Sequence, residues 1–430
     1  MIIDHFNSTT SGGAATAAHR LHQGLCAAGV KSRLWCKRRS DPNSGWHSWK
    51  PAARCSLRRV WDAPRELVAR GALKKERKRE LRGRPSSAAL FSGVRRPYET
   101  PWKSQTSDCL IHLHWTANFL DYPTFFASLS QQQPIIWTLH DANPLTGGCH
   151  LTNECSRFVD GCGNCPQLGR PHPDDWSART FRLKQQAYGE RSVHWIAPSH
   201  WIKRQAELSG LFGKRHQVQV IPHGLDLTTF RPIPRCEARE ILGLPPDRTI
   251  IAFGAASLDD KHKGMHDLVE ALRRTPATRQ TTLLLFGAIR KCPTLPLPHQ
   301  SFGYLEDARQ QALILSSSDI FVIPSHTEVL GLAGLEAMAC GATVIGTRVG
   351  GIPDYVHDQK TGLLVPPRDP SSLSAALTQL LQNRQRRTQL AEAGARLVRR
   401  EFDLAEQTRR HITLYEQVAE QTLPMPRSAA

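Results

Sequence analysis

The sequence contains no apolar run of about 18 residues, the length that a membrane-spanning helix needs. Residues 1–6 also lack the basic stretch followed by an apolar stretch that marks a secretory signal, so we expect a cytoplasmic protein. Acidic residues are scarce: 38 Asp and Glu stand against 56 Lys and Arg, for a net charge of +18. That excess favours an anionic partner, such as nucleic acid, an anionic membrane surface or a phosphorylated ligand.

Cysteines number 11, an odd count, and in a cytoplasmic protein they are expected to be free, metal-bound or catalytic. Four of them form a cluster: Cys149, Cys155, Cys162 and Cys165. The last pair has the C-x-x-C spacing with a glycine inside, which is typical of tetrahedral thiolate coordination, whereas the first pair is spaced more loosely. A structural zinc site, with His150 as a further candidate ligand, is one interpretation. Buried free thiols and a disulfide are the others.

The positive charge is concentrated in residues 50–99, which hold 15 basic and 5 acidic residues and so carry more than half of the net charge. A charge confined to one segment weakens the hypothesis of a dedicated nucleic-acid-binding fold. Apolar residues recur there at helical spacing: Leu57, Val60, Trp61, Pro64, Leu67 and Val68. We expect a basic amphipathic helix with a break or a start at Pro64. It would pack its apolar side on the protein, lie in an anionic membrane interface, or contact RNA.

Short β-like runs alternate with helical stretches along the whole chain, the pattern of a doubly wound α/β architecture. In the first half, the predicted strands cover residues 2–6, 109–114, 135–139, 194–197 and 217–221. The small-residue loop after the first strand contains Gly12 and Gly13. A helix over residues 14–28, ended by Gly29, follows that loop.

The second half repeats the pattern after a proline-rich stretch, residues 222–246, that we interpret as an interdomain linker. Its predicted strands cover residues 249–253, 282–286, 320–323 and 343–346, and its helices cover 266–272, 332–340 and 371–381. Two α/β halves predict a ligand cleft between them, at the carboxyl ends of the strands.

Residues 324–341 carry the strongest functional signal. A strand ends in a polar loop with Glu328 and Gly331, a helix with Glu336 follows, and Gly341 ends that helix. A glycine at a strand-to-helix turn lets backbone N–H groups approach an anion at the helix N-terminus. A carboxylate on each side suits a sugar nucleotide, with Glu336 as the acceptor for ribose hydroxyls. The alternative is an ordinary βα unit with two surface glutamates.

This region resembles the retaining glycosyltransferases of family four, which have the GT-B fold and a Glu–seven residues–Glu motif. Further segments agree with that family: Gly12-Gly13, residues 138–141 (TLHD), 197–199, 221–226, Lys263-Gly264, 350–354 and 362–366. The resemblance covers nearly the whole chain except residues 50–100. It is nearest to the colanic-acid type of polysaccharide-building enzymes, which carry Gly-Cys-His after the His-Asp motif.

The resemblance implies an α/β fold of the GT-B class, with two Rossmann-like doubly wound domains facing a central cleft. Residues 1–222 would form the acceptor-side domain, with the basic helical insertion at about 50–100 and the cysteine cluster at 149–165. Residues 223–400 would bind the nucleotide sugar. Residues 401–430 would form a C-terminal helix that packs back toward the first domain, followed by a tail.

The resemblance also implies roles for single residues. Three are expected to be catalytic: Glu328 at the donor sugar, His140 beside it, and Lys263 at the diphosphate leaving group, where charge grows in the transition state. The expected donor-binding residues are Gly12, Gly13, Lys263, Tyr304, Gly331, Leu332 and Glu336. No cofactor is required for this chemistry, and no dedicated general base is evident.

Two positions depart from the family pattern. The arginine expected before Lys263 is missing, and Lys261 and Arg290 are the candidates for part of its role. Leu330 replaces the usual aromatic residue. The expected partners are a nucleotide-sugar donor and a lipid-linked or saccharide acceptor, in polysaccharide or glycolipid biosynthesis, without nucleic acid and with peripheral contact to the cytoplasmic membrane face. A nucleotide-sugar epimerase on the same fold, or a basic nucleic-acid-binding protein, is the alternative.

Overall fold

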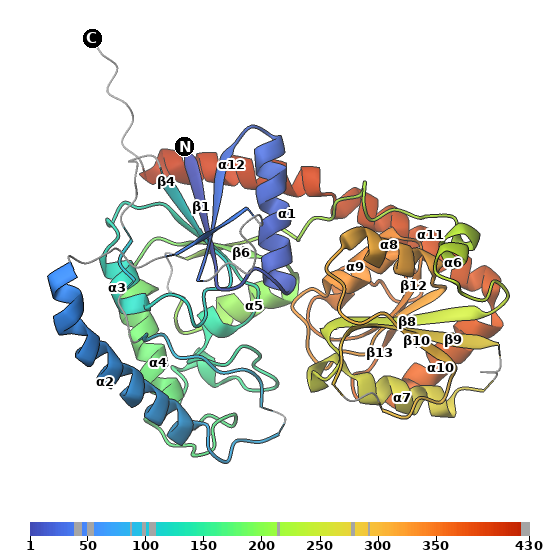
Figure 1. Ribbon diagram of the computed structural model, residues 1–430, viewed down its shortest axis with the longest axis horizontal. Helices are drawn as coiled ribbons and strands as arrows, with labels where there is room; N and C mark the ends of the chain where they lie inside the picture. Colours follow the sequence, from blue (N-terminus) through green and yellow to red (C-terminus); the bar gives the residue numbers. More distant parts are fainter. Residues whose placement is uncertain are drawn as a thin grey trace, which may run out of the picture. The chain divides into compact units, whose positions relative to one another are not determined.

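The computed structural model describes residues 1–37, 45–49, 56–86, 88–96, 100–102, 109–212, 216–276, 280–290 and 293–422. The chain divides into two compact units (Figure 1). Unit 1 consists of Met1–Ile221 and Thr408–Ala430, and unit 2 of Pro222–Gln407. The predicted tail, residues 423–430, lies outside the described residues.

Unit 1 is built on a parallel sheet of seven described strands in the order β3-β2-β1-β4-β5-β6-β7. Their bounds are β1 Ile2–Asn7, β2 Lys31–Cys36, β3 Trp46–Ser48, β4 Cys109–Leu113, β5 Ile135–Thr138, β6 His194–Ala197 and β7 Gln217–Val220. The chain order reverses between β1 and β4, so the loops that follow these two strands diverge and leave a crevice. The pattern of apolar residues predicted β1, β4, β5, β6 and β7. It missed β2, because the sequence of this strand is polar and alternating.

Helices cover both faces of this sheet. They are α1 Gly13–Ala27, α2 Ser56–Glu80, α3 Tyr122–Ala127, α4 Trp176–Lys184, α5 His200–Leu208 and the C-terminal part of α12 Leu404–Thr422, with short helical turns η1 Asn143–Leu145, η2 Arg157–Val159 and η3 Gln185–Gly189. Tyr415 and Val418 of α12 are fully buried and pack against Ile3 and Leu110 of the sheet. This apolar contact fixes the C-terminal helix in the core of unit 1.

Unit 2 is a second parallel sheet, with six described strands in the order β10-β9-β8-β11-β12-β13. The strands are β8 Thr249–Ser257, β9 Thr281–Ala288, β10 His299–Ser301, β11 Ile320–Ile323, β12 Thr343–Thr347 and β13 Leu363–Val365. The helices are α6 Arg235–Ile241, α7 Met265–Arg274, α8 Ala308–Ser317, α9 Leu332–Ala339, α10 Pro370–Gln382 and α11 Arg384–Glu401, with the turns η4 Lys261–Lys263 and η5 Ile352–Asp354. Here the strand order reverses between β8 and β11.

The interpretation of residues 222–246 as a linker is wrong, because α6 forms within them. Pro234 caps the start of this helix, where its missing N–H costs nothing. The buried Arg239 then ties α6 to unit 2: its guanidinium donates to Asp319 Oδ2 (2.7 Å) and to the Ser317 carbonyl (3.1 Å). The prolines therefore begin a helix here instead of keeping the segment extended.

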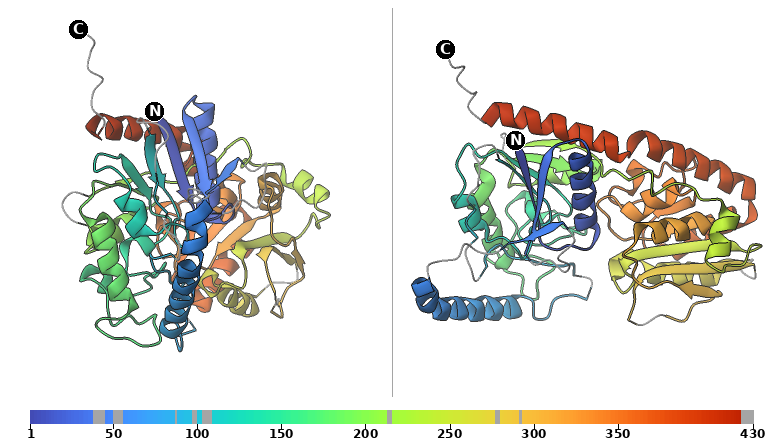
Figure 2. Two further views of the ribbon diagram at one scale, coloured as in Figure 1. Left: turned by 60° about the vertical axis from the view of Figure 1, so that its left-hand side comes forward. Right: turned by 45° about the horizontal axis from the view of Figure 1, so that its top comes forward.

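The predicted break at Pro64 is also wrong, because α2 runs through it from Ser56 to Glu80. One internal proline removes a single backbone hydrogen bond, while the turns on either side keep theirs. In Figures 1 and 2, α2 lies at the outside of unit 1, apart from the sheet. Across the described ranges, every helix is too short or too polar to span a bilayer.

The side of α2 that packs on unit 1 differs from the apolar stripe expected from the sequence. Leu67 and Val68 are 71% and 72% exposed, whereas Leu73 is half-buried and Glu80 is buried. Arg179 of α4 reaches across to α2 and pairs with Glu76 (3.4 Å) and with Glu80 (3.0 Å). Ion pairs therefore help to hold the described part of α2. The structure does not describe the side chains of Leu57, Val60, Trp61 and Pro64.

Candidate functional site

The strongest polar site in unit 2 forms where β8 and β11 diverge. The loop after β8 contains η4, and the loop after β11 leads into α9. Between them, Lys263 Nζ donates to Glu328 Oε2 at 2.7 Å. Two residues 65 positions apart thus meet at the reversal of strand order, the place where open α/β sheets bind ligands.

A glycine makes this approach sterically feasible. Gly264 has a positive φ of 74°, and a Cβ atom there would lie 1.9 Å from the Pro324 carbonyl oxygen. Any side chain would therefore push η4 away from the end of β11 and separate Lys263 from Glu328. The Lys-Gly dipeptide that the sequence singled out combines a charge with the backbone shape that delivers it.

Charge at this site is balanced by the pair itself. Burial lowers the pKa of Lys263, but the Glu328 charge and hydrogen bond outweigh burial, and the pKa of the ammonium is raised above its usual value. Lys263 is therefore a permanent cation at neutral pH. Its side chain remains one-third exposed, so an incoming anion can contact it.

A histidine–carboxylate contact also holds the loop between β11 and α9. The backbone N–H of His326 donates to the His262 carbonyl (2.8 Å), and its side-chain Nε2 lies 2.6 Å from Asp267 Oδ2. The Thr347 hydroxyl also donates to the Ser325 carbonyl (2.5 Å). Sequence reasoning missed these residues, although His326 lies within the loop already singled out.

The N-terminus of α9 lies directly after Glu328. Gly331 is its N-cap in the left-handed region (φ 87°), and the Tyr355 hydroxyl donates to the Gly331 carbonyl (3.1 Å). The Gly351 N–H donates to the Glu328 carbonyl (3.1 Å). The first turn of α9 begins at Leu332, and the N-terminus of a helix together with a lysine bound to the preceding loop is a combination that favours an anion.

Glu336 lies in α9 and is 4% exposed. Gln311 of α8 donates from Nε2 to Glu336 Oε2 at 2.6 Å, a partner that the sequence analysis did not identify. Its amide holds the carboxylate in a fixed orientation. The Glu–seven residues–Glu spacing therefore leaves one glutamate bound to a lysine at the loop and the other buried in the second turn of α9.

Tyr304 and Arg290 lie in loops at the same end of the sheet, after β10 and β9. Tyr304 is 45% exposed and follows Gly303, whose carbonyl accepts from the Gly287 N–H (2.6 Å). Arg290 is almost fully exposed, and its side chain contacts Asp259 Oδ2 (3.3 Å). No contact joins Tyr304 to Glu336 among the described residues, so its role at the base stays a prediction.

Unit 1 carries the remaining predicted residues. Gly12 is the N-cap of α1, with φ 89°, and Gly13 is the first residue of that helix. Both follow β1, and His140 follows β5, so they lie at the carboxyl edge of the same sheet. This edge corresponds to the edge of unit 2 that holds Lys263 and Glu328.

His140 ends a chain of three hydrogen-bonded imidazoles. His140 Nε2 lies 2.9 Å from His114 Nδ1, and His114 Nε2 lies 3.0 Å from His5 Nδ1. His5 is fully buried, and its Nε2 has no hydrogen-bond partner among the described residues. Burial lowers the pKa of His140 to about 4, with Asp141 opposing in part, so its ring is neutral at pH 7.

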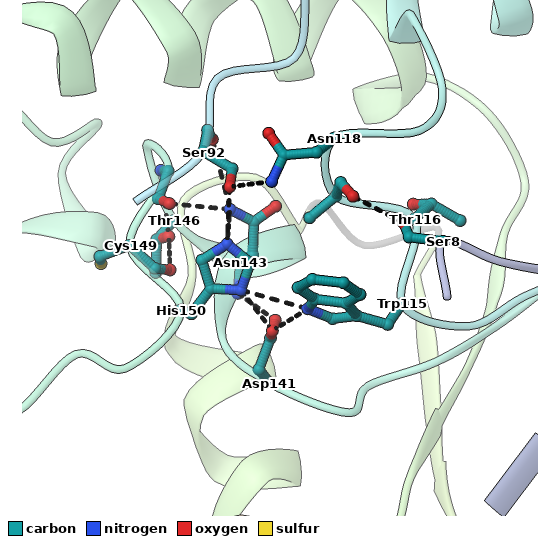
Figure 3. Close-up of polar contacts among 12 residues, drawn as sticks. Ser8, Ser92, Trp115, Thr116, Asn118, Asp141, Asn143, Thr146, Cys149 and His150 are labelled. Carbon is teal, nitrogen blue, oxygen red and sulfur yellow. Dashed lines mark hydrogen bonds and ion pairs between the residues drawn. The ribbon is translucent and has the colours of Figure 1, made fainter. Parts of the chain in front are cut away.

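Asp141 is held by a separate polar network, shown in Figure 3. His150 Nδ1 lies 2.5 Å from Asp141 Oδ2, and the indole N–H of Trp115 donates to the same oxygen (2.6 Å). Burial raises the pKa of Asp141, but these contacts and the Asn143 N–H outweigh burial and lower it overall. Asp141 is therefore ionised, and His150 is engaged here as a partner of a carboxylate.

The four clustered cysteines, Cys149, Cys155, Cys162 and Cys165, line one small cavity of about 10 Å³. Cys162 and Asn164 have positive φ angles, as does the glycine between them, and the Gly147 N–H donates to Cys162 Sγ (3.2 Å). Burial raises the pKa of Cys162 to about 12. The turn and the N–H···S contact have the form of a metal knuckle, and all four thiols are free.

Within the described residues, ligand-type atoms come within 4.8 Å of one another at His5, His112 and His114, and not in the cysteine cluster. The His112 and His114 rings are stacked, with centroids 4.2 Å apart. His112 Nδ1 contacts the Tyr415 hydroxyl (2.7 Å), and Nε2 contacts the Thr138 hydroxyl (2.8 Å). Stacked rings with both nitrogens engaged do not point lone pairs at a common metal.

Comparison with known proteins gives a family match for unit 2. Residues 235–397 match the family model described as Glycosyl transferases group 1. A D-inositol 3-phosphate glycosyltransferase from Xylanimonas cellulosilytica is 33% identical over 219 residues, which are 47% of this chain and 51% of that protein. The Saccharomonospora viridis protein of the same name is 33% identical over 181 residues, 38% and 42%. The chain thus spans about half the length of the curated relatives it matches, or less.

Solved structures match nearly the whole chain. Sucrose-phosphate synthase from Thermosynechococcus elongatus superimposes with a TM-score of 0.67 at 21% identity, covering 98% of this chain and all of that one. HepE from Anabaena, in complex with UDP and glucose, gives 0.64 at 14% identity, covering 97% and 100%. WaaG, a glycosyltransferase of lipopolysaccharide biosynthesis, gives 0.62 at 14%, covering 96% and 99%. The expected GT-B fold class is confirmed, and residues 235–397 match the Glycosyl transferases group 1 model within it.

Proposed function

We propose that the chain moves a hexose from a nucleoside-diphosphate sugar to a hydroxyl acceptor with retention of anomeric configuration, in polysaccharide or glycolipid biosynthesis. The observation that carries the proposal is the Lys263–Glu328 pair at 2.7 Å, beside the N-terminus of α9 and at the reversal of strand order in unit 2. A cation, a helix N-terminus and a carboxylate at one edge suit a ligand that joins a diphosphate to a sugar.

Each group at this edge has a task in such a transfer. Lys263 would turn from Glu328 toward the diphosphate and offset the charge that grows on it as the bond from the sugar C1 to the phosphate oxygen breaks. Glu328, released from the lysine, would accept hydrogen bonds from sugar hydroxyls. Glu336 would accept from the ribose. The acceptor oxygen forms the new bond on the face that the diphosphate leaves, and the acceptor proton goes to the diphosphate.

In unit 1, the imidazole chain would set which nitrogen of His140 carries the proton. Because burial keeps His5 and His140 neutral, each of these two rings carries one N–H and one lone pair. If His5 Nδ1 donates to His114 and His114 Nδ1 donates to His140, the buried His5 Nε2 is a lone pair and not an unpaired N–H, the less costly arrangement. His140 would then present Nδ1–H as a hydrogen-bond donor to the donor sugar.

A thermal-shift screen with UDP-, GDP-, ADP- and dTDP-sugars tests the proposal. A ligand that binds only the folded state raises the melting temperature of the protein. We therefore expect the sugars of one nucleotide to stabilise the protein and the sugars of the other three not to. Glu336→Gln should reduce the shift, and the exposed control Glu392→Gln should not. Stabilisation by no nucleotide sugar would refute the proposed donor class.

Two outcomes would redirect the proposal. An epimerase would convert the stabilising nucleotide sugar without any acceptor, whereas a transferase needs a hydroxyl acceptor for net turnover beyond slow hydrolysis. A nucleic-acid-binding protein would retain RNA or DNA at physiological salt and would keep that binding in Glu336→Gln. Product analysis by mass spectrometry, with and without a saccharide or lipid-linked acceptor, separates these three activities.

We also propose that the cysteine cluster binds a structural zinc ion. Its support is the shared cavity, the left-handed turn at Cys162 and Asn164, and the buried Lys184, whose pKa burial lowers to about 8 while Cys149 and Cys162 oppose that shift. A nearby lysine would offset part of the negative charge of four thiolates. Zinc would hold the segment around η2 together, and it would take no part in the transfer chemistry.

Metal analysis tests the zinc site. About one zinc per chain is expected in the purified protein, and it should be lost in Cys162→Ser/Cys165→Ser. The double variant Cys26→Ser/Cys236→Ser removes two exposed cysteines and should keep the metal. If the wild-type protein and both variants are all purified without zinc, the proposed zinc site is rejected.

A further inference from the structure

Unit 1 contains a groove of about 490 Å³ between α2, the segment 91–96 and α4. Its lining is strongly cationic. The basic residues that line it are Arg70, Lys74, Arg77, Arg95, Arg96 and Arg179, and the acidic residue is Glu76. Cations drawn from three separate segments therefore converge on one hollow.

Most of this charge is not neutralised. Arg179 pairs with Glu76 (3.4 Å) and Glu80 (3.0 Å), and Arg96 Nη2 donates to the Gly93 carbonyl (2.6 Å). Of the remaining cations Arg70, Lys74, Arg77 and Arg95, none has an acidic partner within the part of the chain that the structure describes. Like charges held close together repel one another, so an anion that enters the groove relieves that repulsion.

The groove has a firm wall because its backbone and aromatic residues pack closely. Gly93 lies so near Trp176 that a Cβ atom there would be 2.9 Å from the indole Cζ2 atom. The Phe91 and Trp176 rings pack with centroids 4.9 Å apart. The cations therefore surround a wall that is already ordered, and an anion would bind without first ordering it.

Polar residues connect this groove to the candidate catalytic edge of unit 1. Ser92 and Asn118 line the groove, and Asn118 Nδ2 donates to Ser92 Oγ (3.1 Å). Ser92 Oγ lies 3.0 Å from His150 Nε2, and His150 contacts Asp141, the neighbour of His140 (Figure 3). Two buried side chains, Ser92 and His150, therefore link the groove to the His140–Asp141 dipeptide through hydrogen bonds.

We propose that this groove binds the phosphate or diphosphate group of an anionic acceptor, and that Ser92 and His150 couple its occupancy to the His140–Asp141 dipeptide. The inference rests on the proposed transferase function, because it assigns the groove to the substrate that receives the sugar. A phosphate group matches several converging cations better than a neutral saccharide does, since charged hydrogen bonds form only with the former.

The phosphate can belong to a soluble sugar phosphate or to a lipid-linked saccharide. Leu67 and Val68 of α2 are 71% and 72% exposed, one turn before Arg70 at the groove. An apolar pair next to a phosphate site is the arrangement that a lipid chain would use. Both sources present the same group to the cations, and the two probes below distinguish them.

Titration calorimetry with inorganic pyrophosphate tests the groove directly. The variant Lys74→Ala/Arg77→Ala removes two lining cations. We expect it to raise the Kd about 10-fold, which is the typical effect of losing two half-exposed ion contacts. The control Lys75→Ala/Lys78→Ala removes the same charge from the same helix at positions that do not line the groove, and the Kd should change less than 2-fold. Equal weakening by both pairs would overturn the proposal in favour of diffuse surface charge.

Pyrophosphate can also bind at Lys263, so the same titrations are run in the Lys263→Ala background. Binding that persists there and is lost on adding Lys74→Ala/Arg77→Ala belongs to the groove. If Lys263→Ala alone abolishes all binding, the groove proposal fails while the donor site stands. If Lys263→Ala changes nothing and the groove pair removes binding, the donor-site assignment fails instead.

Sedimentation with vesicles of phosphatidylcholine containing 20% phosphatidylglycerol identifies the source of the phosphate. A lipid-linked acceptor predicts retention that falls several-fold in Leu67→Ser/Val68→Ser and in Lys74→Ala/Arg77→Ala, but not in Lys75→Ala/Lys78→Ala. A soluble sugar phosphate predicts no retention and an unchanged pyrophosphate Kd in Leu67→Ser/Val68→Ser. Retention that both lysine pairs weaken equally indicates general membrane attraction and contradicts a built phosphate site.

Discussion

Units 1 and 2 have the same architecture, a parallel sheet with a reversal of strand order, but they build their candidate sites differently. In unit 2, the loops after two adjacent strands supply Lys263 and Glu328, and one glycine sets their approach. In unit 1, the polar residues come from β1, β4, β5, the segment 91–96 and the cysteine-rich loops. The site in unit 2 is therefore compact and comes from two loops, whereas the site in unit 1 is assembled from many segments.

This difference suggests that the two units recognise different substrates. A site fixed by two loops and a helix N-terminus suits the invariant part of a substrate, a diphosphate and its ribose. A site assembled from an added helix and several loops can change without disturbing the sheet, which suits an acceptor. The following predictions challenge this division, from the largest expected effect to the smallest.

Replacing Lys263 by alanine tests the compact site. Loss of the cation leaves the leaving diphosphate uncompensated, and kcat/KM for transfer should fall roughly 100- to 1,000-fold. The exposed Lys360→Ala removes the same charge elsewhere in unit 2 and should change the rate less than 2-fold. A fall below 5-fold in Lys263→Ala would contradict the assigned role, as measured by release of the nucleoside diphosphate.

Gly264→Ala tests whether backbone shape delivers that lysine. The new Cβ would meet the Pro324 carbonyl at 1.9 Å and require an unfavourable φ of 74°, so unit 2 should lose about 2–4 kcal/mol of unfolding free energy. Gly243→Ala is the matched control, because it also has a positive φ but no atom within 4 Å of the added Cβ. It should cost about 1 kcal/mol. Urea unfolding of both variants gives the comparison, and equal losses would reject the close-approach argument.

The two units should also differ in acid stability. Burial is the largest cause that lowers the pKa of seven described imidazoles in unit 1: His5, His19, His22, His112, His140, His194 and His216. In unit 2, burial lowers the pKa of His262. Below pH 6.5 the unfolded chain binds protons that these folded rings refuse. Unit 1 should therefore lose stability as the pH falls from 6.5 toward 4.

Hydrogen exchange with mass spectrometry measures this contrast within one molecule, because unit 2 acts as the internal control. Between pH 7 and pH 5, after correction for intrinsic exchange rates, protection should fall earlier in peptides of β1, β4 and β5 than in peptides of β8, β11 and β12. Earlier loss in unit 2 would contradict the assignment of neutral buried imidazoles to unit 1.

Tyr304 should give the smallest effect. An exposed ring that stacks on a base contributes about 1 kcal/mol, so Tyr304→Ala should raise the donor KM about 5-fold with little change in kcat. Tyr304→Phe keeps the ring and should restore the KM. If the phenylalanine variant is as impaired as the alanine variant, the hydroxyl and not stacking is responsible.

The sequence was most informative where determinants are local. Strand β11, the loop with Glu328 and Gly331, and helix α9 follow one another in the chain, so their alternation and glycines predicted both element and site. Contacts between distant positions left no such pattern. The contacts of Gln311 with Glu336, of Asp267 with His326 and along the His5–His114–His140 chain join residues 25 to 109 positions apart, on separate helices, strands and loops.

The errors have a related cause. Proline was interpreted as a breaker at residues 222–246 and at Pro64, yet Pro234 caps α6 and α2 continues through Pro64. Proline restricts its own φ and removes one N–H, and neighbouring hydrogen bonds decide whether a helix tolerates it. The predicted central cleft, the role of Tyr304 and the zinc ion stay predictions, because each depends on a contact or ligand beyond the described interactions.

The most direct test of the central claim, that unit 2 binds a nucleotide sugar at the β8–β11 reversal, is calorimetric titration of the nucleoside diphosphate that stabilises the chain. We predict that Glu336→Gln raises its Kd at least 10-fold and that Glu392→Gln, on the exposed surface of α11, leaves it unchanged. An unchanged Kd in Glu336→Gln, with the variant folded, would contradict the account.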